Sequence, residues 1–523
     1  MPSTVRVHWQ DVAAFMQKQR DETIAKVSPA IPDPPQDLPL NVTNAFLRRA
    51  GLAQKLANCV TELLPERALE RARYLDDYLA EHKKPIGPLH GLPISVKEHI
   101  GMKGLNLNAG FISWCDKVGD EDALILQLLW KAGAVFYVRT TQPQTLMHLE
   151  TSSNLYGVTV NPFNRALTSG GSSGGEGALL GLRGSCMGIG TDIGGSIRSP
   201  AANNGIFGLR PTSYRLPNRG CAATMLGQEH IVPVIGPLST SLDGIELFMK
   251  TLIDQKPWLY EPSLLPFPWR DTASSSLLRV SGSGQRKLKV GIIGDDGVVK
   301  PHPPVLRALN RLTTALGSHG DVELVDFPPY KHNEAWRIIS FLYFADSAAE
   351  EKAAIDASQE PWRPLSHFII TDNPNVRNLT VSEVWKLTSE REDYRTQYAA
   401  HWNSVSGSVD ANDLVDVILC PVGPGVAPQI DTSRYWGYTS QWNLLDYPAL
   451  VFPTGLKVEP EKDIRQEGYM SRNEKDEYNY NLYEAEKYRD APIALQLVGR
   501  RYEDEKVIEA LELITQVAGL PFD

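Results

Sequence analysis

Two glycine-rich stretches of this chain place serine hydroxyls among bare backbone amides, where they could serve catalysis or anion binding. The first is GGSSGGEGALLG, residues 170–181, and the second is GIGTDIGGSIRSPAANNGIFGLRPT, residues 188–212. A phosphate-binding P-loop ends in Gly-Lys-Ser/Thr, and a dinucleotide-binding loop follows G-x-G-x-x-G. Neither stretch completes either pattern, so the serines are the better candidates for chemistry.

The first stretch contains the pattern G-x-S-x-G twice, centred on Ser172 and on Ser173. In α/β-hydrolases this pattern forms a nucleophile elbow, and an acidic residue and a histidine must follow later in the chain. None of the later histidines lies in a context typical of that histidine loop: His230, His302, His319, His332, His367 and His401. The elbow stays an alternative, in which Ser173 would be the nucleophile.

In the second stretch, two glycines directly precede Ser196. Successive amides without side chains can point at one oxygen, which is how a backbone alone builds an oxyanion hole. The alternative interpretation is a tight turn before a helix.

Lys97 follows the apolar segment PISV, residues 93–96. A lysine can act as a base when burial lowers its pKa, although a solvated surface charge is the commoner fate of a lysine. Glu176 opens an expected helix, and we interpret it as structural because helix N-termini favour acidic residues.

Taken together, three segments closely resemble the amidase signature family of serine hydrolases. They are GPLHGLPISVKEHI (87–100), SGGSSGGEGALLG (169–181) and the second glycine-rich stretch. Further similar pieces are VNPFN (160–164), GPLSTSLDGI (236–245), DYPALVFPTG (446–455) and PIALQLVGR (492–500). The resemblance extends from about residue 75 to the end of the chain, and it is greatest to fungal acetamidase-like general amidases.

The resemblance implies a Ser–Ser–Lys triad with no histidine. We expect no metal or cofactor, because the sequence shows no ligand cluster and no phosphate-binding loop. Ser196 would be the nucleophile that forms an acyl-enzyme, and Lys97 would be the base. Ser172, held by a cis peptide bond after Gly171, would pass the proton between them.

The resemblance also implies roles for the residues around the triad. The amides of Ile193, Gly194, Gly195 and Ser196 would form the oxyanion hole. Ser173, Asp192 and Arg198 would support the site through hydrogen bonds, with ordinary turn capping as the alternative for Asp192 and Arg198. Leu146 would line the acyl pocket, unless it is simply a core residue.

The expected reaction is hydrolysis of the C–N bond of a small or medium carboxylic amide, aliphatic or aryl, to an acid plus ammonia or an amine. One alternative is an acyltransferase or an ester- or amide-forming biosynthetic enzyme on the same scaffold. Another is a non-enzymatic binding or assembly subunit. The expected partner is a small-molecule amide, and a homodimer is one expectation, since many members of the family are dimers.

Composition argues against several other classes of function. The 523 residues carry a formal net charge of −10, which argues against nucleic acid or an anionic membrane as the main partner. The five cysteines include no C-x-x-C pair, so neither a disulfide framework nor a zinc site is expected. No signal-peptide apolar region and no run of 18 apolar residues occurs, so we expect a cytoplasmic protein that does not span a membrane.

The segments around the candidate site residues alternate between expected strands and expected helices. A strand at 92–96, a helix at 122–132 and a strand at 134–138 alternate, as do 288–294, 303–320 and 322–327. Such alternation predicts an α/β fold with a mixed, mostly parallel sheet flanked by helices on both faces.

The expected domain organisation has two parts. Residues 1–74 form a helical lead-in with a proline-rich connector at 28–42, and residues 75–523 form one large amidase signature domain. Two helices are expected within 43–83.

Overall fold

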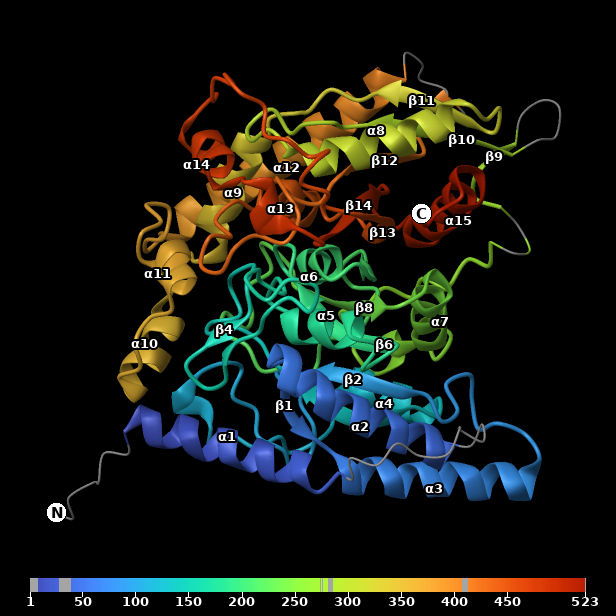
Figure 1. Ribbon diagram of the computed structural model, residues 1–523, viewed down its shortest axis with the longest axis vertical. Coiled ribbons are helices and arrows are strands. Elements are labelled where there is room, and N and C mark those ends of the chain that lie inside the picture. Colours follow the sequence, from blue (N-terminus) through green and yellow to red (C-terminus); the bar gives the residue numbers. More distant parts are fainter. Residues whose placement is uncertain are drawn as a thin grey trace.

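The structure is a computed structural model that describes residues 8–27, 39–272, 274, 276–280, 286–406 and 413–522. Within these residues, one twelve-stranded sheet extends along the long axis of the molecule (Figure 1). Its strands lie in the order β1-β3-β2-β6-β8-β7-β13-β14-β12-β10-β11, and β9 pairs with β10. Their bounds are β1 (Val60–Leu63), β2 (Pro93–Lys97), β3 (Val135–Thr140), β6 (Met187–Asp192), β7 (Phe207–Arg210), β8 (Val234–Ser239), β9 (Arg279–Val280), β10 (Arg286–Ile292), β11 (Val322–Asp326), β12 (Val417–Pro421), β13 (Ala449–Lys457) and β14 (Pro492–Val498). A separate small pair joins β4 (Ser152–Ser153) to β5 (Gly157–Val158).

The mixed sheet expected from the sequence is confirmed, but the expected predominance of parallel pairs is wrong. Parallel pairs occur towards the two ends of the sheet, where β2 lies between β3 and β6, and β10 lies between β11 and β12. From β6 through β8, β7, β13 and β14 to β12, every neighbouring pair is antiparallel. Parallel neighbours need a long crossover, and the sequence alternates strand and helix clearly only at the parallel ends.

Helices cover both faces of this sheet. Their bounds are α1 (Trp9–Ala25), α2 (Pro39–Ala57), α3 (Pro65–His82), α4 (Leu124–Lys131), α5 (Gly174–Gly181), α6 (Arg198–Asn203), α7 (Leu242–Ile253), α8 (Pro303–Gly317), α9 (His332–Tyr343), α10 (Ala349–Ser358), α11 (Pro364–Ile370), α12 (Val381–Val405), α13 (Gly437–Leu445), α14 (Glu474–Leu482) and α15 (Asp504–Ala518). The largest core cluster joins α4, α7, α8 and α15 to one face of the sheet. Other clusters join α2, α3 and α5, or α9, α12 and α13, to strand residues of the other face.

The N-terminal segment contributes a strand to the sheet, which the sequence alone did not predict. Between the two helices expected within residues 43–83, β1 pairs antiparallel with β3. A four-residue strand between two helices carries too little alternation to be recognised. The expected connector at 28–42 lies outside the described residues up to residue 38, and residues 39–42 begin α2. The division of the chain after residue 74 stays a prediction.

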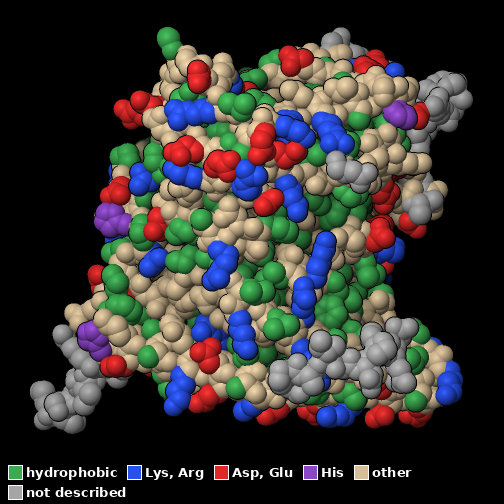
Figure 2. All heavy atoms as spheres, in the orientation of Figure 1, with side chains coloured by type: hydrophobic (Ala, Val, Ile, Leu, Met, Phe, Trp, Pro, Cys, Tyr) green, Lys and Arg blue, Asp and Glu red, His purple; other side chains and the backbone are tan. Residues whose placement is uncertain are grey.

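Charged side chains of both signs occur together on the visible face of the molecule (Figure 2). On the face shown in Figure 2, basic and acidic side chains lie interspersed among polar and apolar ones. Among the described helices, none combines the length and apolar character that crossing a bilayer requires. All five cysteines are free thiols.

Candidate active site

Lys97 is the last residue of β2, and strand alternation decides where its side chain points. Ile94 and Val96 join the largest core cluster on one face of the sheet. Ser95 and Lys97 therefore project to the opposite face, towards α5 and the loop that precedes it. There the Lys97 ammonium nitrogen lies 2.7 Å from Ser172 Oγ and 2.9 Å from Thr191 Oγ1, and the side chain is fully buried.

Ser172 lies in the loop that leads into α5. The Gly171–Ser172 peptide bond is cis. Gly171 has no room for a side chain, because a Cβ there would lie 2.4 Å from the backbone nitrogen and oxygen of Glu150. The loop is therefore packed tightly against the segment that follows Leu146, with the Ser172 hydroxyl facing Lys97.

Ser173 connects this loop to β6 through hydrogen bonds, and its hydroxyl is engaged in them and is not exposed for nucleophilic attack. Its hydroxyl donates to the Thr191 carbonyl and accepts from the Thr191 amide, both at 3.3 Å. Its own amide donates to the Ser196 carbonyl at 3.1 Å. The side chain is fully buried, an environment unlike the exposed serine of a nucleophile elbow.

Ser196 lies in the loop between β6 and α6. Together with Ser172, Thr191, Asp192 and Ile193 it lines a cavity of about 160 Å³. The structure thus brings all three residues of the expected triad to one place: Ser196 and Ser172 share the cavity, and Ser172 contacts Lys97.

Asp192 and Arg198 hold the loop that carries Ser196. Arg198 Nε and a terminal nitrogen donate to the two carboxylate oxygens of Asp192 at 3.0 and 2.9 Å, and both side chains are buried. Burial alone would raise the pKa of Asp192, but the Arg198 charge and the hydrogen bonds outweigh it and lower that pKa. The carboxylate also accepts the Ile197 amide at 3.1 Å. This bidentate pair fixes both ends of the loop.

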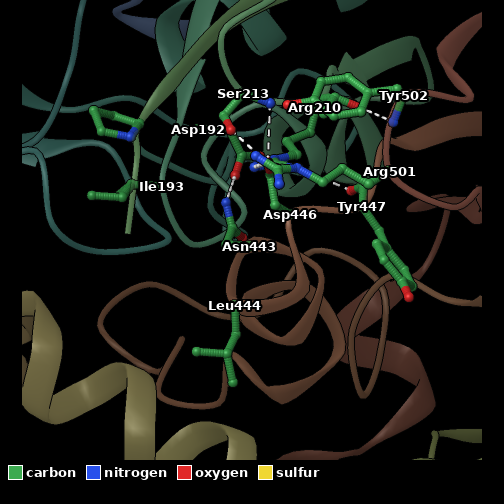
Figure 3. A network of polar contacts seen from close by, with 12 residues as sticks. Asp192, Ile193, Arg210, Ser213, Asn443, Leu444, Asp446, Tyr447, Arg501 and Tyr502 are labelled. Atoms are coloured by element: carbon green, nitrogen blue, oxygen red, sulfur yellow. Dashed lines mark hydrogen bonds and ion pairs between the residues drawn. The ribbon is translucent and has the colours of Figure 1, made fainter. Parts of the chain in front are cut away.

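Helix α13 supports the same loop from the other side. Asn443 donates to Asp192 at 2.8 Å (Figure 3), and it accepts from Arg198 at 2.6 Å. Beside this network Asp446 forms a second one, in which three donors converge on its carboxylate: Arg210, Ser213 and Arg501. The two networks together attach α13 to the strand ends that carry the site.

The backbone from Ile193 to Gly195 turns its carbonyls away from the cavity. The Ile193 carbonyl accepts from Tyr343 Oη and the Gly194 carbonyl accepts from Thr439 Oγ1, each at 2.7 Å. In a trans peptide the N–H points opposite to the carbonyl, so the Gly194 amide faces away from Tyr343. The Gly195 amide, however, donates to Asp192 at 2.9 Å. That amide is therefore engaged in holding the loop, which the sequence could not reveal.

The wall of the cavity is mainly apolar. Leu146 lies in it, where the sequence resemblance places it. Other apolar lining residues are Met147, Ile193, Ala223, Met225, Leu226, Pro233 and Val234. Thr145, Leu146 and Met225 all have positive φ angles, between 60° and 68°, a conformation that side chains other than glycine seldom adopt.

The buried site lowers the basicity of Lys97. Burial lowers its pKa to about 7, although Asp192, Cys221 and Glu176 act in the opposite direction. Glu176, next to it on α5, is fully buried and accepts hydrogen bonds from Ser95 at 2.5 Å and Thr140 at 2.8 Å. Burial raises the pKa of Glu176 to about 8. A neutral lysine is thus accessible near pH 7.

Sequence reasoning missed two residues of the site, Thr191 and His99. Thr191 Oγ1 lies within hydrogen-bond distance of both Lys97 and His99. Thr191 stands in the second glycine-rich stretch, and His99 follows Lys97 by two residues, but neither residue type signals its role alone. Among the described residues, no group of three or more histidine, cysteine, aspartate or glutamate side chains could hold a metal ion.

Comparison with known proteins identifies the family. The sequence model of the Amidase family matches residues 41–508. This chain belongs to the amidase signature family. A putative amidase of Schizosaccharomyces pombe is 48% identical over 478 residues, which cover 91% of this amidase and 86% of the relative. An acetamidase of Emericella nidulans is 40% identical over 480 residues, covering 92% and 86% of the two chains.

A solved structure of a fatty acid amide hydrolase supports the same assignment. It is 35% identical to this amidase, with a TM-score of 0.86, and the match covers 99% of this chain and 86% of that one. The amidase is therefore an amide-hydrolysing enzyme. This result removes the alternative of a non-enzymatic binding or assembly subunit.

Proposed function

We propose that this amidase hydrolyses the C–N bond of small or medium carboxylic amides through an acyl-enzyme on Ser196. The observation that carries the proposal is the 2.7 Å contact between Lys97 and Ser172, at the edge of the cavity that Ser196 lines. A serine hydroxyl needs a base to become a nucleophile, and the lowered pKa of Lys97 suits that role.

In the proposed mechanism, neutral Lys97 takes the proton of Ser172 while Ser172 takes that of Ser196. Ser196 Oγ then bonds to the amide carbon, and the C–N electrons leave with nitrogen. The proton returns through Ser172 to the departing ammonia or amine. Water repeats the sequence on the acyl-enzyme and releases the acid.

The developing oxyanion needs donors that are fixed before the reaction. We assign this role to the amides of Ile193, Gly194 and Ser196. The Gly195 amide does not belong to the set, because it donates to Asp192. In this proposal Asp192 and Arg198 support the hole by holding the loop, and Ser173 supports it by fixing the Ser196 backbone.

The cavity supports an acyl group larger than acetyl. Its volume of about 160 Å³ is comparable to an engineered apolar cavity that admits benzene, and its wall is mainly apolar. Similar proteins bear the names acetamidase and fatty acid amide hydrolase, which bracket a wide range of chain lengths. A medium aliphatic or aryl acyl group fits this cavity best, and esters of the same acids should react too.

The test combines a substrate series with covalent labelling. Straight-chain amides from acetamide to dodecanamide, together with benzamide, should give a maximum of kcat/KM between the extremes. A fluorophosphonate should add its mass to a peptide containing Ser196, and the Ser196→Ala variant should be unlabelled and inactive. Labelling of Ser173 instead would contradict the assignment.

Product analysis addresses the remaining alternative of acyl transfer. With an amine or alcohol added at millimolar concentration, the proposed hydrolase should still release mainly the free acid. Predominant formation of a new amide or ester would favour an acyltransferase on the same scaffold.

A further inference from the structure

Lys97 has a second hydrogen-bond partner whose own partner is a buried histidine. Thr191, on β6, places its hydroxyl 2.9 Å from the Lys97 nitrogen and 3.0 Å from His99 Nε2. The imidazole is 4% exposed and is held at its other nitrogen, since His99 Nδ1 lies 2.8 Å from the Ala222 carbonyl. The three side chains thus form a short chain of contacts that ends on a backbone carbonyl.

The Ala222 carbonyl fixes the tautomer of His99. A carbonyl oxygen can only accept a hydrogen bond, so Nδ1 must carry the hydrogen. Burial, reinforced by the charge of Lys97, lowers the pKa of His99 to about 3. The ring is therefore neutral at ordinary pH, and a neutral imidazole has one N–H. Nε2 is left as an acceptor that faces the Thr191 hydroxyl.

This tautomer decides the direction of the next two hydrogen bonds. Thr191 has a single hydroxyl hydrogen, which it donates to Nε2. Towards Lys97 its oxygen can then only accept. A neutral lysine carries two N–H groups and one lone pair, so Lys97 donates one hydrogen to Thr191 and keeps its lone pair. Ser172 Oγ, 2.7 Å away, is the hydroxyl that can donate to that lone pair.

We propose that His99 is a positioning residue that, through Thr191, directs the lone pair of Lys97 towards Ser172. The inference rests on the proposed function, in which Lys97 is the base. With the opposite tautomer, Thr191 could donate to Lys97 and compete with Ser172 for the lone pair. The backbone that carries the ring is fixed as well, because the His99 amide donates to Gln142 at 3.1 Å and the His99 carbonyl accepts the Ala222 amide at 2.8 Å.

The anchor of His99 is adjacent in sequence to the wall of the cavity. Ala222 is followed by Ala223, Thr224 and Met225, which line the cavity. Thr224 Oγ1 donates to Glu351 at 2.6 Å and the Met225 amide donates to Glu350 at 2.9 Å, so α10 fixes this segment. The wall that contacts the substrate and the carbonyl that sets the tautomer are thereby one continuous stretch of chain.

Two amide variants separate the donor and acceptor functions of the imidazole. In His99→Asn the amide reaches the position of Nδ1, so it can serve Ala222 but offers Thr191 no acceptor. In His99→Gln the side chain reaches the position of Nε2 and can offer that acceptor. The readout is the rate at which a fluorophosphonate labels Ser196, measured from pH 5 to pH 10, which needs no knowledge of the natural substrate.

We expect His99→Asn to lower the plateau labelling rate by about 10–100-fold, the usual effect of losing an outer hydrogen-bond partner. His99→Gln should retain most of the rate. In His99→Asn the Thr191 hydroxyl can donate to neutral Lys97, so the acidic limb should stay in place or move to lower pH. Thr191→Val removes the acceptor that orients Lys97, so its plateau rate should also fall, and Thr191→Ser should restore the rate.

His302→Gln is the matched control, because His302 is also buried and contacts a backbone carbonyl, that of Asn479. It should label at the wild-type rate. A wild-type rate in folded His99→Asn, equal loss in the Asn and Gln variants, or an acidic limb moved to higher pH would each overturn the inference. Lys97→Ala separates the two proposals: activity in that variant would defeat the proposed function itself, whereas an inactive Lys97→Ala beside a fully active His99→Asn would defeat only the role of His99.

Discussion

At the scale of single residues, Lys97 and Glu176 are ionisable groups in places where their types are rarely found. Both are fully buried, and the charge of each shifts the pKa of the other. The sequence identified Lys97 only through its resemblance to a family, because one lysine after a strand is ordinarily a surface charge. It left out His99 and Thr191, since their role depends on hydrogen-bond direction across two strands, which no local pattern encodes.

Glu176 should make stability depend on pH. Its folded pKa of about 8 exceeds the ordinary value of about 4.5, so between these values the folded protein holds a proton that the unfolded chain releases. Stability from this group is therefore present below pH 4.5 and is lost as pH rises through 8. In Glu176→Gln the amide cannot titrate, so Tm should fall less than in the wild type between pH 5 and pH 8.

Below about pH 7 Lys97 is largely protonated in both proteins, and its lowered pKa makes stability rise only between about pH 7 and 10.5, so the comparison from pH 5 to 7 reports Glu176. Thermal unfolding at fixed ionic strength measures the difference. Parallel curves of Tm against pH for the wild type and Glu176→Gln would show that Glu176 is ionised in the folded protein.

At the scale of elements, the loop between β6 and α6 depends on glycine for its shape. Gly195 has φ = 129°, and a Cβ there would lie 2.4 Å from Thr439 Oγ1 on α13. The sequence shows the two glycines and indicates a turn before a helix. It does not indicate that α13 packs against this loop, because α13 lies more than 200 residues later in the chain. The antiparallel centre of the sheet was missed for a similar reason, because three of its five strand pairs join strands that are not consecutive in the sequence.

Gly195→Ala should therefore impair activity more than stability. The clash and the unfavourable φ angle should cost about 1–3 kcal/mol, and displacement of the loop should lower kcat by about 10²–10³-fold, as loss of an oxyanion-hole donor does. Gly104→Ala is the matched control, since Gly104 also has positive φ (76°), but a Cβ there would meet no atom of a non-adjacent residue within 4 Å. Equal kcat in Gly195→Ala and Gly104→Ala would contradict the structural account of this loop.

At the scale of the whole molecule, the N-terminal segment is part of the packing that supports the site. Leu47 on α2, Val60 and Leu63 on β1 belong to one core cluster with Tyr137 on β3 and Leu179 on α5. Helix α5 follows directly on the loop that carries Ser172, so this cluster underlies the site. Sequence similarity to the family placed the start of the domain near residue 75 because the motifs that carry it begin there, whereas packing extends further.

Two truncated chains test where the folding unit begins. Removal of residues 1–74 deletes α1, α2, β1 and the first part of α3, and it uncovers α5, so the chain 75–523 should be insoluble or fail to label with fluorophosphonate. The chain 39–523 loses only α1 among the described elements, and it should fold and label with a reduced Tm. A soluble, fully labelled 75–523 chain would instead support the division after residue 74.

The most direct test of the central claim is the pH dependence of kcat/KM for amide hydrolysis in the wild type, Lys97→Arg and Lys97→Ala. If neutral Lys97 is the base, kcat/KM of the wild type should rise with pH through about 7 and then level off, because the ammonium must lose its proton before Ser196 attacks. Arginine keeps the charge but cannot release a proton in this range, so both variants should lose about 10²–10⁴-fold or more. A folded Lys97→Arg enzyme with substantial activity would contradict the account, since it would show that the site needs a positive charge at this position and not a base.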